Sequence, residues 1–108
     1  MRYEMLLCNL QKYHNGAAQA VSSSELEAAF SMSGREIRTA VNALRSAGEP
    51  ICSDENGYYY AASEQELKHS IRQLDSRIGQ IERAKKGLEK ALPTYSNQNG
   101  GNVWNSPH

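Results

Sequence analysis

The sequence has little cysteine and no excess of charge of either sign. Cys8 and Cys52 are the two cysteines, and they lack the CxxC spacing of a metal or redox motif. Because their surroundings are apolar, we predict that both are buried free thiols in a reducing compartment. Twelve basic and twelve acidic side chains give a net charge of zero. Any binding of a polyanion must therefore come from a local cluster of basic residues.

Long hydrophobic runs are also absent. No stretch approaches the roughly 20 apolar residues that a membrane-spanning helix needs, and the first residues lack the apolar run of a signal peptide. We therefore expect a soluble, cytoplasmic protein with no membrane partner. A chain of 108 residues with 39% hydrophobic content predicts one small domain, with room for an extension.

The residue patterns of common catalytic sites are missing as well. The three histidines, His14, His69 and His108, stand far apart and lack metal-ligand spacing to cysteine or carboxylate. No serine or cysteine has a histidine arranged for nucleophilic catalysis, and the glycines do not have the spacing of a phosphate-binding loop. We expect no enzyme, no cofactor and no metal site.

The strongest local signal is a helix over residues 33–48. Ser33 and Glu36 have the spacing of a capping box, and Gly48 suits a left-handed helix end. The polar side of this helix carries three arginines and no acidic residue. Arginine, asparagine and threonine are residue types that contact phosphates and base edges in DNA. A solvated helix face is the simpler alternative. At about 100° per residue, the apolar side holds Ile37, Ala40, Val41, Leu44 and Ala47, and the polar side holds Arg35, Arg38, Thr39, Asn42, Arg45 and Ser46.

Two shorter helices are predicted before it. Apolar residues at helical spacing indicate an amphipathic helix over residues 2–13, and Asn15 and Gly16 end it. Residues 17–21 then form a turn and a brief strand or extended link. Ser22 and Glu25 repeat the capping-box spacing and begin a second helix. The inward residues are expected to be Tyr3, Leu6, Leu7, Leu10 and Tyr13 in the first helix and Leu26, Ala29 and Phe30 in the second.

After Gly48 the pattern indicates a β-hairpin. Residues 50–52 and 58–61 read as strands, and Asn56 and Gly57 form a turn dipeptide between them. The predicted fold class is mainly α with a small β-hairpin: a winged helix-turn-helix domain over residues 1–62, followed by a long coiled-coil helix.

That helix is predicted to begin with a third capping box, Ser63 and Glu66, and to end at Pro93. Its apolar side chains follow a heptad repeat, which favours a parallel two-stranded coil with an attractive Arg77–Glu82 pair between chains. The alternative is that the same stripe packs on the chain's own first helix. Residues 63–92 form this helix and residues 93–108 a disordered tail that contains Trp104. The predicted dimerisation residues are Leu67, Ile71, Leu74, Ile78, Ile81, Lys85, Leu88 and Leu92.

Residues 2–62 resemble the winged helix-turn-helix domains at the amino end of biotin-operon repressors and of related bacterial and phage proteins. The shared positions are Leu26, Ala29, Ser33, Arg35, Leu44, Arg45, Gly48, Gly57 and Tyr58. The resemblance implies that the helix over residues 33–48 enters the major groove and that the hairpin approaches the neighbouring backbone. Asp54 and Glu55 depart from this pattern, because a hairpin that contacts phosphates is expected to carry basic residues.

Two hypotheses follow from these patterns. The first is a dimeric, sequence-specific protein that binds double-stranded DNA, as a transcriptional regulator or a phage replication accessory factor. The second is a winged-helix adaptor that binds another protein, such as one of replication or transcription, through the tyrosine-rich strand at residues 58–60, the long helix or the tail. The predicted DNA-binding residues are Ser33, Arg35, Arg38, Thr39, Asn42, Arg45 and Asn56.

Overall fold

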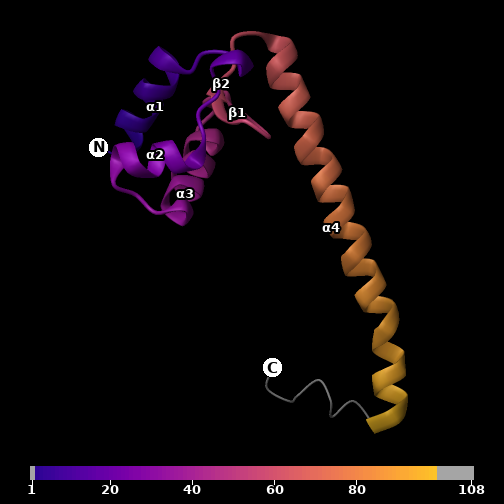
Figure 1. Ribbon diagram of the computed structural model, residues 1–108. Coiled ribbons are helices and arrows are strands. Elements are labelled where there is room, and N and C mark those ends of the chain that lie inside the picture. The colour runs from indigo at the N-terminus through magenta and orange to yellow at the C-terminus, as the bar shows by residue number, and fades with distance from the viewer. Residues whose placement is uncertain (1, 100–108) are drawn as a thin grey trace. The chain divides into compact units, whose positions relative to one another are not determined.

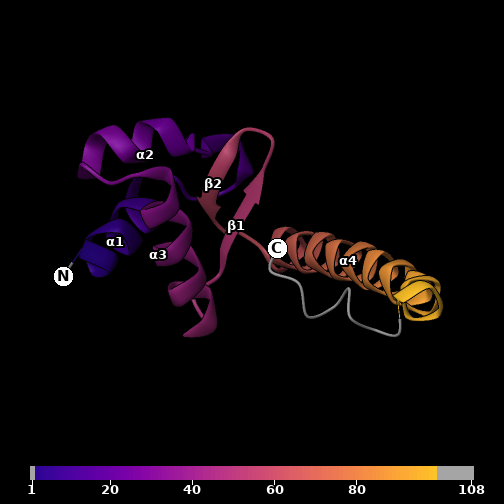
Figure 2. The same cartoon turned by 90° about the horizontal axis from the view of Figure 1, so that it is seen from below.

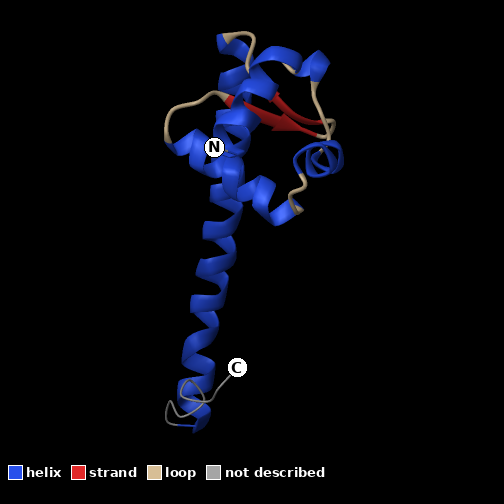
Figure 3. Ribbon diagram, turned by 90° about the vertical axis from the view of Figure 1, so that its left-hand side faces the viewer, coloured by secondary structure: helices blue, strands red, loops and turns tan. Residues whose placement is uncertain are grey.

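The structure, a computed structural model, describes residues 2–99 and is mostly helical with one small hairpin (Figures 1 and 3). Its contacts divide the chain after Arg72 into two compact units. The elements in chain order are helices α1 (Arg2–Tyr13), η1 (Ala17–Gln19, a 3₁₀ turn), α2 (Ser23–Phe30) and α3 (Gly34–Ser46), strands β1 (Ile51–Asp54) and β2 (Gly57–Tyr60), and helix α4 (Glu64–Asn99).

Three serines begin helices, as predicted from their spacing. The hydroxyl oxygen of Ser22 accepts the Glu25 N–H, that of Ser33 accepts the Glu36 N–H, and that of Ser63 accepts the Glu66 N–H. Only at Ser33 does the glutamate side chain also accept the N–H of the capping serine, at 2.9 Å. The start of α3 is therefore fixed by a complete capping box, which satisfies two backbone donors within one turn.

The hairpin is antiparallel and is extended by the link that precedes α2 (Figure 2). Cys52 pairs with Tyr59 in its register. On the other side of β2, Val21 and Tyr58 exchange two backbone hydrogen bonds of 2.9 and 2.8 Å. The predicted extended link at Val21 is confirmed. It gives β2 a neighbour on both sides, which stabilises a hairpin that would be marginal alone.

The turn of the hairpin depends on Gly57. Its φ is +127°, and a Cβ atom there would overlap the carbonyl oxygen of Val21. The Asn56 N–H donates to the carboxylate of Asp54 at 2.8 Å, which holds the tip in a turn. Glycine is therefore required both by its backbone conformation and by the close approach of the link.

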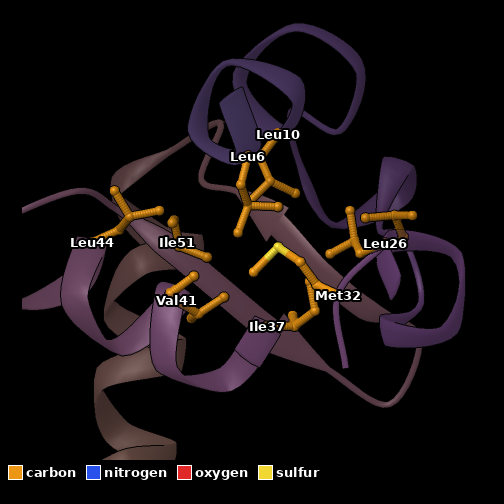
Figure 4. Close-up of a cluster of buried hydrophobic side chains, with 10 residues drawn as sticks. Leu6, Leu10, Leu26, Met32, Ile37, Val41, Leu44 and Ile51 are labelled. Atoms are coloured by element: carbon orange, nitrogen blue, oxygen red, sulfur yellow. The ribbon is translucent and has the colours of Figure 1, made fainter. Parts of the chain in front are cut away.

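A single hydrophobic cluster joins the helices of the first unit to the hairpin (Figure 4). Met32, between α2 and α3, lies among side chains from α1 and α3, and Ile51 brings β1 onto the same cluster. The predicted α3 face is confirmed except for Ala47, which is exposed. The buried members are Leu6, Leu10, Val21, Leu26, Met32, Ile37, Ala40, Val41, Leu44 and Ile51.

The first turns of α4 pack on the hairpin. The buried thiol of Cys52 lies 3.8 Å from the Glu66 carbonyl oxygen, and the carboxylate of Glu66 accepts the N–H groups of Ala17 and Ala62 at 2.9 and 2.8 Å. These two backbone hydrogen bonds hold the pKa of Glu66 below its ordinary value. Glu66 thus ties η1 and the loop before α4 together.

Four predicted inward residues outside α3 are exposed: Tyr3, Cys8, Tyr13 and Ala29. Tyr3 and Tyr13 lie in the first and last turns of α1, where fewer neighbouring elements cover the helix. Cys8 lies about 200° around α1 from both Leu6 and Leu10, so it points away from the core, and only Cys52 is a buried thiol. Ala29 is exposed because α2 packs through Leu26 and Phe30, and Ala29 lies about 100° around the helix from Phe30. Both cysteines are free thiols, as predicted.

The prediction that Pro93 ends the long helix is wrong. Helix α4 continues through Pro93 to Asn99. A helical proline loses one backbone hydrogen bond, but its fixed φ fits the helix, and the exposed surroundings let water hydrate the freed carbonyl group. Seven residues of the predicted tail, 93–99, are therefore helical, and the rest of it, including Trp104, lies outside the described residues.

Candidate nucleic-acid interface

The polar face of α3 is the candidate interface. Four predicted DNA-binding residues, Arg35, Arg38, Thr39 and Asn42, are exposed on this face. The opposite face is buried in the core, so packing fixes the direction in which these four side chains leave the helix. The structure therefore presents two arginines, an amide and a hydroxyl together. Two acidic side chains border them, Glu36 beside Arg35 and Thr39, and Glu27 of α2 near the Arg38 guanidinium.

A shallow hollow borders the first turns of this face. Its volume is about 250 Å³, and it is lined by Tyr3 of α1, by Met32, and by Arg35, Glu36 and Thr39 of α3. Sequence analysis did not predict it, because Tyr3 comes next to α3 only through the packing of two helices. The hollow places an aromatic ring beside Arg35 and Thr39, at the edge of the candidate interface.

Arg45 is bound within the fold. Its Nε donates to the Ile51 carbonyl oxygen at 2.8 Å, and its Nη2 donates to the Ser53 hydroxyl at 3.3 Å. The side chain is half-buried and joins the last turn of α3 to β1. Helix periodicity placed it on the polar side, but its partners lie six and eight residues away in a strand, beyond what periodicity predicts.

Ser33 and Asn56 lie at the margins of the candidate interface. Ser33 is exposed, and both its hydroxyl oxygen and its N–H take part in the capping box. Asn56 is exposed at the hairpin tip, and the neighbouring Glu55 is exposed as well. The backbone N–H of Asn56 donates a hydrogen bond to the Asp54 carboxylate. The tip therefore carries one amide side chain and two acidic residues, Asp54 and Glu55.

The three tyrosines of β2 are largely withdrawn from solvent. Tyr58 and Tyr60 are half-buried and pack against the core, and Tyr59 is buried. Burial raises the pKa of the Tyr59 phenol, and the neighbouring Ser70 hydroxyl acts against that shift. The buried Ser70 Oγ makes no hydrogen bond of good geometry in the described part of the chain. These aromatic rings stabilise the fold and offer little exposed surface to a partner.

Helix α4 carries the apolar stripe that the heptad pattern predicted. Leu67, in the first unit, is half-buried, and Lys85 is exposed. The six other residues of the stripe are between 38% and 74% exposed in the single chain, although each is a large aliphatic side chain. They are Ile71, Leu74, Ile78, Ile81, Leu88 and Leu92.

Among the described residues, no group of three or more histidine, cysteine, aspartate or glutamate side chains is placed to hold a metal ion. Within residues 2–99, no helix combines the length and the apolar character that crossing a membrane requires. Comparison of the chain with known protein families, with curated proteins and with solved structures finds no match.

Proposed function

We propose that this chain is a dimeric, sequence-specific protein that binds double-stranded DNA, as a regulator of transcription or an accessory factor of replication. The exposed polar face of α3, with Arg35, Arg38, Thr39 and Asn42, is the observation that carries the proposal. Arginine and asparagine form bidentate contacts with guanine and adenine in the major groove, and an α-helix fits that groove.

The arrangement of elements supports a winged helix-turn-helix. Helix α2 ends at Phe30, Ser31 caps it with a left-handed φ of +53°, and α3 begins at Gly34. The hairpin follows α3 directly, and Arg45 fastens the two elements together. A short turn between two helices and a hairpin after the second are the parts that such a domain needs.

We propose a division of roles on α3. Asn42, in the middle of the face, is proposed to contact adenine, and Arg38 guanine. Arg35, near the start of the helix, is proposed to neutralise a phosphate. Arg45 instead positions the hairpin, because its guanidinium is already bound by β1. At the hairpin tip, Asn56 is the proposed backbone contact.

The apolar stripe of α4 supports the dimer. Ile71 and Ile78 fall at position a of the heptad and Leu74 and Leu88 at position d, a choice that favours parallel two-stranded coils. Their exposure in the single chain leaves an apolar surface that a second copy would cover. Two α3 helices would then meet half-sites about 34–36 Å apart on one face of the duplex.

Fluorescence anisotropy with labelled duplexes, together with molecular mass from light scattering, tests the proposal. A duplex selected from random sequence should bind more tightly than unselected DNA, and Asn42→Ala should reduce that preference, whereas Arg35→Ala should weaken all duplexes alike. Gln11→Ala, on the exposed side of α1, is the control and should change neither.

Absence of binding at about 50 mM salt, where phosphate contacts are strongest, would contradict the DNA proposal. The protein adaptor would then be the better hypothesis. Its original support, an exposed tyrosine strand, is weakened by the burial of Tyr59 and the packing of Tyr58 and Tyr60. A monomeric mass at every concentration would contradict the dimer separately from the DNA binding.

A further inference from the structure

The side of α4 that faces away from the apolar stripe is basic. In the heptad register, positions b, c and f between residues 69 and 90 cover an arc of about 100°. The charged residues in this arc are Arg72, Arg83, Lys86 and Lys90, and no acidic residue occurs there. We call these four residues the basic face. All four side chains are exposed.

Neighbouring groups leave these cations available. The acidic residues of the same stretch, Asp75, Glu82 and Glu89, all fall at position e, between the basic face and the stripe. None of the four cations forms an ion pair with a described residue, whereas Lys68 in the first turns pairs with Glu64 at 3.0 Å. At Gly79, the missing side chain leaves room for the Arg83 guanidinium, which lies 3.6 Å from where a Cβ would stand.

Charge is distributed unequally along the chain. Residues 1–62 contain five basic and seven acidic side chains, whereas residues 63–92 contain seven basic and five acidic ones. The region that holds α3 therefore has a net negative charge, and the hairpin tip adds to it locally. Since phosphate contacts supply much of the affinity of DNA-binding proteins, α3 alone is a weak source of that affinity.

We infer that the basic face is a second DNA contact, which binds backbone phosphates without reading sequence. The inference rests on the proposed DNA binding. Arg72 and Lys90 are 18 residues apart, so the face extends about 27 Å along the helix, enough to meet several phosphates. Pairing of two copies through the stripe would leave both basic faces directed outward, available to DNA.

The test compares two double variants of the full chain that remove the same number of lysines. Lys86→Gln with Lys90→Gln neutralises half of the basic face, and Lys12→Gln with Lys68→Gln is the matched control elsewhere. Glutamine forms helices about as well as lysine, so the helix should persist. Circular dichroism and light scattering check helix content and mass for both variants.

Anisotropy titrations of an unselected duplex between about 50 and 200 mM salt give the slope of log affinity against log salt. The first variant should lose about 0.9 from the slope for each phosphate contact removed, and the control should keep the wild-type slope. An unchanged slope in the first variant, or an equal loss in both, would overturn the inference. In those two cases a selective effect of Asn42→Ala would leave the proposed function standing. If the wild-type chain binds no duplex, the proposed function fails, and the inference fails with it.

Discussion

The two parts of the chain differ in where they place their large apolar side chains. In residues 3–72, side chains such as Leu10 and Ile37 are fully buried by other elements of the same unit. In residues 73–95, Ile81 and Leu88 remain 62% and 74% exposed. Both parts are helical and amphipathic, so secondary structure alone does not distinguish them.

The difference indicates what each part needs in order to be stable. The first unit has a core of its own, built from three helices, a link and a hairpin. A single helix has no such core, and most helical stability in proteins comes from packing of the apolar face. We therefore expect the stability of the first unit to be independent of protein concentration, and that of the distal part of α4 to depend on a partner.

The largest expected difference between the two parts comes from exchanging a glycine for alanine in each. Gly57→Ala should cost at least about 4 kcal/mol of unfolding free energy, because it strains a φ of +127° and meets the Val21 carbonyl group. Gly87→Ala should instead stabilise α4 by about 1 kcal/mol, since the new Cβ would meet no described atom within 4 Å beyond the adjoining residues and the nearby helix backbone, and alanine favours helix. Denaturant unfolding followed by circular dichroism measures both.

Equal effects of the two substitutions, in sign and size, would show that the glycines stand in similar surroundings. Loss of stability in Gly87→Ala alone would mean that this side of α4 is covered by something that a methyl group displaces. Either result would contradict the comparison between a packed unit and an open helix.

Features that depend on neighbouring residues could be predicted from the sequence. The capping box of Ser33 with Glu36 and the two faces of α3 follow from spacings of three and four residues, and all the groups involved lie within one helix. The heptad stripe of α4 is a local pattern in the same sense. The exposed members of the candidate interface, such as Arg38 and Asn42, were found in this way.

Features that depend on tertiary packing could not be predicted. Periodicity puts Arg45 on the polar side of α3, but only the position of β1 shows that Ile51 and Ser53 bind it. The hollow beside Arg35 requires the packing of α1 on α3. Pro93 is a third case, because its sequence signal is common to helix ends and to helix interiors that tolerate a missing hydrogen bond.

Two isoleucines, one in each part of the chain, differ in burial and should differ in what their truncation costs. Ile37→Ala should cost about 3 kcal/mol of unfolding free energy, because the side chain is fully buried and leaves a cavity in the core. Ile81→Ala removes the same atoms from a side chain that is 62% exposed, so the first unit should unfold as before. In the proposed dimer, Ile81→Ala should raise the dissociation constant at least about tenfold, because one side chain that the partner covers is truncated in each copy.

Unfolding of the first unit at several protein concentrations, with sedimentation equilibrium for the mass, separates these two effects. Ile37→Ala should lower the midpoint equally at every concentration. A dissociation constant that Ile81→Ala leaves unchanged would remove Ile81 from the dimer interface and, with it, the proposed heptad register.

Two glutamates in the first turn of α4 differ in what they bind. Their substitution should give the smallest of the expected changes in unfolding free energy. Glu66 accepts two backbone N–H groups from outside α4, whereas Glu64 makes a surface ion pair with Lys68. Glu66→Gln should therefore cost about 1 kcal/mol at pH 7, and Glu64→Gln close to nothing.

The pH dependence follows from the lowered pKa of Glu66 in the folded chain. Its stabilisation is fully present above the ordinary glutamate pKa of about 4.3, and it is lost as the pH falls through the lower, folded value. The difference in unfolding free energy between wild type and Glu66→Gln should thus shrink between pH 7 and pH 3. A constant difference at all pH values would mean that the Glu66 carboxylate does not hold η1 through its charge.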